Sequence, residues 1–196
     1  MKSSTSRSKI AAAVVATFGL IAGNAMADST LTTAAPWNAA TNLDFRIVIP
    51  SVLYFRVGNA ASVTELTFSP TTANVGTAAP ISPTGGDAAL GTGVNVEIRA
   101  NRGQVTITAT NNVASGLTTG VPADGFINLN TISTTSDNAD LGAPALTNAG
   151  GTTSTPTLSS NKTTQRTAVW TYSYSNATLP SAGSYAGRVT YTASTL

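Results

Sequence analysis

The chain has 196 residues, with ten Lys and Arg against eight Asp and Glu, no His and no Cys. The absence of Cys excludes disulfides, and the absence of His excludes a Ser-His-Asp triad, His-containing zinc sites and His-ligated haem. Few enzyme classes survive these exclusions, so the sequence predicts a protein that is not an enzyme and that needs no cofactor and no metal.

Residues 1–27 have the pattern of a cleaved signal peptide. A positively charged start is followed by an apolar run over 10–22 and by a small-x-small triplet that ends at Ala27. The run is shorter than the roughly 20 residues of a membrane-spanning helix, and no later stretch is long enough. We therefore expect a secreted protein with no transmembrane segment after cleavage.

Cleavage also changes the charge balance. The first 27 residues contain the three cations Lys2, Arg7 and Lys9. Without them, seven basic residues face eight acidic ones, and no basic stripe remains to neutralise phosphates. The sequence therefore predicts no nucleic-acid partner.

The remainder of the chain predicts strands and turns. Residues 28–41 contain Pro36 and no sustained period, which indicates an extended N-terminal arm. Alternation of apolar and polar residues predicts strands over 43–49, 52–57 and 63–68, and Pro50 ends the first of them. A long Pro/Gly-rich loop over 71–93 follows.

The clearest local signal is a predicted β-hairpin. Two alternating runs, 94–99 and 105–110, are joined by Asn101-Arg102-Gly103, with Gly103 a candidate for the left-handed bulge position. A further strand is expected over 126–132. Residues 133–163 predict a surface loop with one short strand near 145–146 or 158.

The last two predicted strands carry four of the five tyrosines and one of the two tryptophans. The first, 167–174, sets Trp170, Tyr172 and Tyr174 on one face. It is expected to pair with the terminal strand 184–193 through a turn over 175–183. On that terminal strand, inward and outward positions alternate, and one face consists of Tyr185, Gly187, Val189, Tyr191 and Ala193.

Together these elements predict an all-β protein without helices. The expected fold is an antiparallel, immunoglobulin-like β-sandwich with Greek-key connections and seven to nine strands. The predicted organisation is a signal peptide over 1–27, an extended arm over 28–41 and a single domain over 42–196.

Two residue groups are candidate ligand sites, and each also has a purely structural interpretation. Residues 137–142, Asp-Asn-Ala-Asp-Leu-Gly, resemble the start of a calcium loop but lack the Glu that would close it, and surface turns use the same residues. Trp37 together with the aromatic face at 170, 172 and 174 could stack on sugar rings, although aromatic residues on such strands are more often part of the core.

The acidic and nucleophilic residues point to no reaction. The acids considered for a glycosidase pair are Asp44, Glu65, Glu97, Asp124, Asp137 and Asp140. Nothing in their spacing selects two of them. A Ser-Lys pair would need Lys162, which lies in a polar loop where its amine would stay solvated.

One family resemblance rests on the two ends of the chain. The stretch 179–191, Leu-Pro-Ser-Ala-Gly-Ser-Tyr-Ala-Gly-Arg-Val-Thr-Tyr, is similar to the C-terminal strand of spore coat protein U-like and other chaperone–usher fimbrial subunits. Residues 45–50 and 54–58 resemble the opening strands of such proteins. The chain departs from the pattern of many of them because it has no disulfide.

The resemblance implies an immunoglobulin-like subunit that lacks one strand. A periplasmic chaperone would cover the open groove, and the N-terminal arm of a neighbouring subunit would fill it, with an outer-membrane usher guiding assembly. Residues 28–41 would be the donor arm and 184–193 the groove edge. The implied partner-binding residues are Leu31, Trp37, Tyr185, Gly187, Val189 and Tyr191.

We therefore expect a structural, pilin-like subunit of a fimbrium that contributes to adhesion at the surface of a Gram-negative bacterium, after transit through the periplasm. Its partners would be copies of itself or other pilin-like subunits. The alternative is a secreted binding module, an adhesin or carbohydrate-binding domain, that uses the loops 71–93 and 133–163.

Overall fold

The computed structural model describes residues 29–148 and 150–195, so the predicted signal peptide lies outside the described residues. The described part contains the strands β1 (Leu53–Val57), β2 (Gly93–Ala100), β3 (Val105–Asn111), β4 (Leu117–Thr118), β5 (Phe126–Ile127), β6 (Ile132–Ser136), β7 (Thr152–Ser154), β8 (Thr164–Tyr174) and β9 (Val189–Thr195). Single-turn 3-10 helices are η1 (Ala89–Gly91), η2 (Pro122–Asp124), η3 (Leu129–Thr131) and η4 (Ala139–Leu141). The chain is all-β, as predicted.

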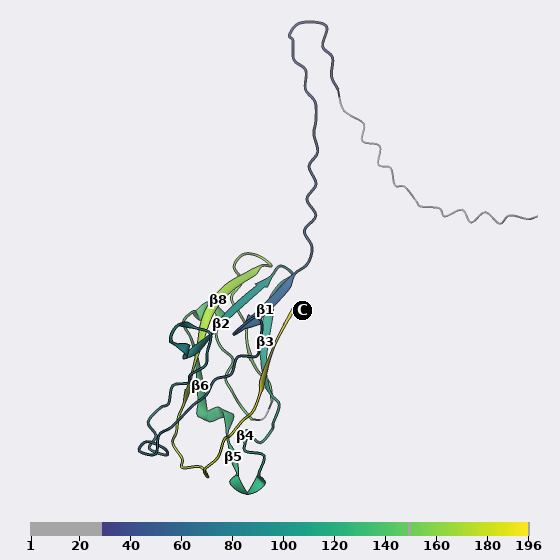
Figure 1. Cartoon of the computed structure of the whole chain (residues 1–196). Helices are drawn as coiled ribbons and strands as arrows, with labels where there is room; N and C mark the ends of the chain where they lie inside the picture. The colour runs from purple at the N-terminus through teal and green to yellow at the C-terminus, as the bar shows by residue number, and fades with distance from the viewer. Residues whose placement is uncertain (1–28, 149, 196) are drawn as a thin grey trace, which may run out of the picture. The chain divides into compact units, whose positions relative to one another are not determined.

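Two antiparallel sheets make up most of the fold. The first has the strand order β1-β2-β8-β6, and the second has the order β7-β3-β9. Figure 1 shows β1, β2 and β8 side by side, with β3 and the yellow C-terminal strand in the second sheet. The short β4–β5 ladder forms a separate two-stranded sheet. Residues 49–195 form one compact unit, and residues 29–48 belong to another.

The predicted hairpin of 94–99 with 105–110 is wrong. β2 pairs with β1 and β8, whereas β3 pairs with β7 and β9, so the turn at 101–103 connects the two sheets instead of two neighbouring strands. Gly103 has φ 132° and donates its N–H to the Lys162 carbonyl. Alternation predicts a strand and its buried face, but it does not identify the strand beside it.

The predicted pairing of the last two long strands is also wrong. β8 lies between β2 and β6, and β9 pairs with β3. The terminal strand is shorter than expected, because β9 begins at Val189 and the stretch before it forms only one bridge, from Ala186 to Thr118.

Three local predictions also differ from the structure. Residues 43–49 form no strand, and 63–68 contribute a single bridge from Thr67 to Thr84. The expected loop 133–163 contains most of β6 and all of β7, which lies at neither expected position. Among the described residues, no helix is long and apolar enough to cross a membrane.

Side chains from both sheets pack into one hydrophobic core. Alternate residues of β2, β3 and β8 are buried, which is the period of two that the sequence displays. Trp170 is fully buried near the middle of this core, and its indole N–H donates to the Leu141 carbonyl at 2.9 Å. The alternative that placed Trp170, Tyr172 and Tyr174 in the core is confirmed, since all three are buried.

A buried Asn176 fixes the long loop 71–93 to the end of β8. Its side-chain oxygen accepts the Gly76 N–H at 2.9 Å, and its amide donates to the carbonyls of Asn74 and Ala79. Within the same loop, Ile81 forms a bridge with Tyr174. The loop is thus attached to the domain by both backbone and side-chain hydrogen bonds.

Candidate interaction surface

The outer edge of β9 carries backbone groups with no partner strand among the described residues. The Asn112 N–H donates to the Arg188 carbonyl, which fixes the phase of the β3–β9 ladder. In an antiparallel ladder, bonded and non-bonded residues alternate. The even-numbered residues of β9 therefore bond to β3, and the odd-numbered ones direct their N–H and C=O groups outward: Val189, Tyr191, Ala193 and Thr195.

The same odd-numbered residues of β9 turn their side chains toward the core. Val189, Tyr191 and Ala193 pack against the buried cluster, yet each is only half-buried. The Tyr191 ring lies 5.4 Å from the Trp170 ring, and its hydroxyl is 3.1 Å from the Tyr172 hydroxyl. The core is thus incompletely covered along this edge.

The Tyr172–Tyr191 pair gives the fold a dependence on alkaline pH. Burial raises the pKa of both tyrosines above the usual value of about 10. The stability that this provides is complete below pH 10 and is lost above it, because only the unfolded chain then ionises. We expect each tyrosine to contribute a loss of about 1.4 kcal/mol per pH unit above its unfolded pKa.

Urea unfolding at about pH 8 and about pH 11 checks this expectation. In the Tyr172→Phe/Tyr191→Phe double variant, the drop in unfolding free energy between the two pH values should be clearly smaller than in the unsubstituted protein. An equal drop in both proteins would show that other groups cause the alkaline loss.

The edge of β1 is open in the same way. The Gly58 N–H donates to the Asn95 carbonyl, so the even-numbered residues of β1 direct their backbone N–H and C=O groups to β2. The outward backbone groups belong to Leu53, Phe55 and Val57, and the side chains of Phe55 and Val57 pack against the core. β1 and β9 come into contact, so two open edges lie on the same side of the core.

Residues 43–49 present apolar side chains to solvent. Leu43, Phe45, Ile47 and Ile49 occupy alternate positions and are 76%, 85%, 85% and 76% exposed. The polar residues Asp44 and Arg46 lie between them, so an extended chain would carry one apolar face and one mostly polar face. A stripe of this size is unusual on a monomeric surface and is typical of an interaction site.

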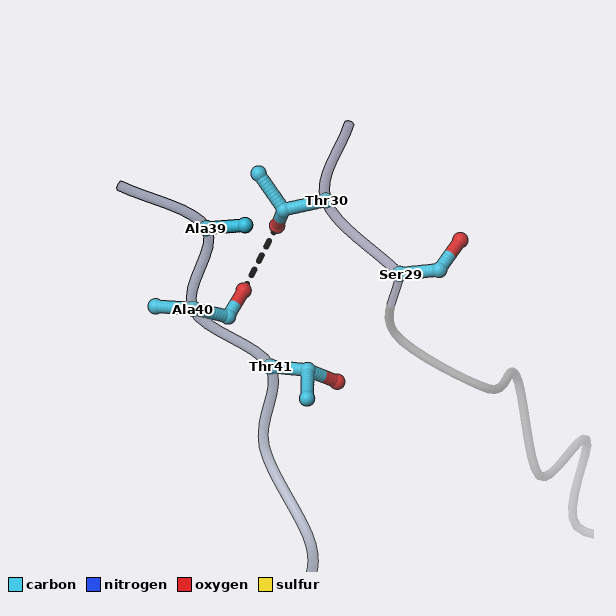
Figure 2. Close-up of a pocket in the computed structure, with 5 residues that line it drawn as sticks. All are labelled: Ser29, Thr30, Ala39, Ala40 and Thr41. Atoms are coloured by element: carbon cyan, nitrogen blue, oxygen red, sulfur yellow. Dashed lines mark hydrogen bonds between the residues drawn. The ribbon is translucent and has the colours of Figure 1, made fainter. Parts of the chain in front are cut away.

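Residues 30–40 turn back on themselves. The Thr30 hydroxyl donates to the Ala40 carbonyl at 2.6 Å, which Figure 2 shows, and the Thr32 hydroxyl donates to the Asn38 carbonyl at 2.8 Å. A hollow of about 220 Å³ beside the first bond is lined by Ser29, Thr30, Ala39, Ala40 and Thr41. Its lining contains no titratable side chain, so it offers no acid–base chemistry.

The six predicted partner-binding residues fall into three places. Leu31 and Trp37 are exposed in the folded-back segment, at 87% and 73%. Tyr185 and Gly187 precede β9: the Tyr185 hydroxyl donates to the Asp124 carbonyl, and Gly187 lies against the Leu117 side chain. Only Val189 and Tyr191 lie on the open edge of β9.

The sequence did not predict that the apolar residues of 43–49 are exposed. Their alternation of apolar and polar residues predicts a strand of the domain as readily as a strand offered to a partner. Pro50 directly after this run was the available signal, since it separates 43–49 from β1.

The polar side chains of the candidate calcium loop 137–142 make hydrogen bonds and an ion pair within the domain. The Asp137 carboxylate accepts the Val169 N–H at 2.7 Å, Asn138 caps η4 by accepting the Asp140 N–H, and Asp140 lies 3.2 Å from Arg166. No group of three or more Asp, Glu, His or Cys residues with metal-binding spacing occurs in the described part of the chain.

Three other acids of the described residues, Glu97, Glu65 and Asp87, form ion pairs or line an open hollow. Glu97 bonds to Arg99 at 2.9 Å and approaches Arg56 at 3.6 Å. Glu65 and Asp87 line an open polar hollow of about 530 Å³ with Asn59, Ser62, Val63, Thr64, Thr67, Gly85 and Gly86. Asp87 accepts the Asn95 N–H there and approaches Arg56, which assigns it a structural role.

Comparison with known proteins gave no relatives. No protein-family model matches the chain, and neither a curated protein nor a solved structure does.

Proposed function

We propose that this chain is a structural, pilin-like subunit of a bacterial surface appendage that assembles by β-strand complementation and contributes to adhesion. The observation that carries the proposal is the exposed apolar stripe of 43–49 together with the open edge of β9 in the same chain. An extended strand with one apolar face supplies what that edge lacks, namely backbone partners and cover for half-buried core residues.

The strand order supports an immunoglobulin-like sandwich that lacks one strand. The order β1-β2-β8-β6 corresponds to strands A, B, E and D of that fold, and the adjacent β3 and β9 correspond to C and F. Strand G would lie beside F, which is the open edge of β9. β7 is an additional strand on the far side of β3.

The occupant of the missing position is residues 43–49 of a second copy. This segment has four apolar residues at a spacing of two, whereas 28–41 offers only Leu31 and Trp37 as large apolar side chains and folds back within 30–40. The inward residues of β9 follow the same spacing. An in-register insertion therefore buries all four apolar side chains at once.

The proposed cellular setting rests on the resemblance to fimbrial subunits and is supported by the same exposed surfaces. An open edge and an apolar stripe on one chain would aggregate during export unless covered. A periplasmic chaperone would cover them in transit, and an outer-membrane usher would exchange it for the next subunit. The subunit would then belong to the surface of a Gram-negative cell, with copies of itself or other pilin-like subunits as neighbours.

The test is the double variant Phe45→Ser/Ile47→Ser. We expect the unsubstituted chain to form concentration-dependent multimers in sedimentation velocity and the variant to remain monomeric. The physical reason is the loss of two buried aromatic and aliphatic contacts, each contributing about 1.5–3 kcal/mol when fully covered.

The matched control is Asp44→Ser/Arg46→Ser, which makes the same number of serine substitutions on the opposite face of the segment. Its multimers should persist. Far-UV circular dichroism should give the same β-sheet spectrum for both variants, because neither pair lies in the core. An unsubstituted chain that stays monomeric at every concentration and temperature would contradict the proposed function.

A further inference from the structure

We infer that Asn101 directs the 43–49 segment to another copy by preventing the chain from filling its own open edge. This inference rests on the proposed function. The open edges of β1 and β9 belong to the same chain as the segment, and only Pro50, Ser51 and Val52 separate Ile49 from β1. Self-insertion is therefore the nearest competitor of assembly.

The side chain of Asn101 holds this connection in line with β1. Its oxygen accepts the Val52 N–H at 2.9 Å, and its amide donates to the Pro50 carbonyl at 2.8 Å. The Asn101 backbone N–H donates to the Val52 carbonyl at 3.3 Å. Together these bonds continue the β1–β2 ladder beyond Leu53, which pairs with Ala100.

Self-insertion requires these bonds to break. To place its apolar face inward, the segment must set its odd-numbered residues opposite the odd-numbered residues of β1, because directly opposite residues share a face and a one-residue slip exposes the whole stripe. In the tightest such register, Ile49 and Ile47 lie opposite Leu53 and Phe55. That register leaves a three-residue loop of Pro50-Ser51-Val52. Such loops form a type I turn followed by a left-handed residue, so all three residues leave the line of β1.

The three-residue loop needed for self-insertion is favourable at its first position, because Pro50 suits the start of a type I turn. Its third position is unfavourable, because Val52 is β-branched and strongly disfavours the left-handed conformation. Asn101 adds two hydrogen bonds that exist only while the connection is extended. Asn101 is thus a positioning residue that makes self-insertion cost more than insertion into a second copy.

Hydrogen–deuterium exchange of the monomer fraction tests the inference, using the full-length chain expressed with its own N-terminal segment. In the unsubstituted monomer, the amides of 43–49 should exchange as an unpaired segment. In Asn101→Ala, the same amides should exchange at least about tenfold more slowly in the monomer, because the segment pairs with its own edge. The multimer fraction should fall correspondingly.

Two further variants make the result decisive. Asn101→Asp has the same size but loses the donor to Pro50, and it should shift exchange in the same direction if Asn101→Ala fails to fold. Asn138→Ala is the matched control, because Asn138 also bridges a backbone N–H and a carbonyl, those of Asp140 and Thr167, away from the connection. It should leave exchange at 43–49 unchanged.

The possible failures are distinguishable. Unprotected 43–49 amides in both Asn101 variants, alongside unsubstituted chains that still form multimers, would overturn the role of Asn101 and leave the proposed function intact. Protection in the variants of a chain that never forms multimers would support Asn101 and contradict the proposed function. Protection already present in the unsubstituted monomer would overturn the inference.

Discussion

Replacing Ala193 by proline should abolish self-association and leave the domain folded. The Ala193 N–H points away from β3, to the open edge of β9, so proline removes no hydrogen bond of the isolated domain. It does remove a donor that an inserted strand needs, and its ring obstructs the approach of that strand. Sedimentation velocity should show monomers at concentrations at which the unsubstituted chain forms multimers.

The neighbouring Thr192→Pro variant is the matched control, because its N–H faces β3 opposite Thr108. There proline breaks a ladder hydrogen bond within the domain and leaves the Thr108 carbonyl without its donor, which should reduce the unfolding free energy by about 1–3 kcal/mol. Urea titrations of both variants provide the comparison. If Ala193→Pro still forms multimers with an unchanged midpoint, the open edge of β9 is not the assembly site.

Replacing Trp170 by alanine should produce the largest loss of stability among the core variants. The side chain is fully buried, contacts the Tyr191 ring and donates to the Leu141 carbonyl. Large-to-small substitution of a buried tryptophan costs about 3–5 kcal/mol, and the Leu141 carbonyl also loses its donor. Because domains are stable by only about 5–15 kcal/mol, this variant should be largely unfolded at modest urea concentrations.

The control is Trp37→Ala, which removes the other tryptophan of the chain, 73% exposed. Its unfolding midpoint should match that of the unsubstituted protein, and its remaining fluorescence reports Trp170 alone. Circular dichroism follows all three proteins on the same scale. A Trp170→Ala midpoint equal to that of Trp37→Ala would show that Trp170 does not support the core.

The sequence by itself determined the all-β class and the inward faces of the long strands. Val94, Val96 and Ile98 on β2 and Trp170 on β8 are buried as their spacing predicts, because a pleated strand shows alternate side chains to opposite faces whatever its neighbours are. The sequence by itself also limited the possible chemistry, because the absence of His and Cys removes functional groups wherever the remaining residues lie.

Only the tertiary structure decided which strands pair and which alternating residues stay exposed. The turn at 101–103, which the sequence predicts to close a hairpin, connects the two sheets, and β9 pairs with β3 instead of β8. The choice of partner strand depends on packing between residues far apart in the chain. The alternation at 43–49 fits a strand inside the domain and a strand offered to a neighbour equally well. The exposure of Phe45 and Ile47 excludes a buried strand of the domain, since burial is a property of the folded chain and not of its pattern.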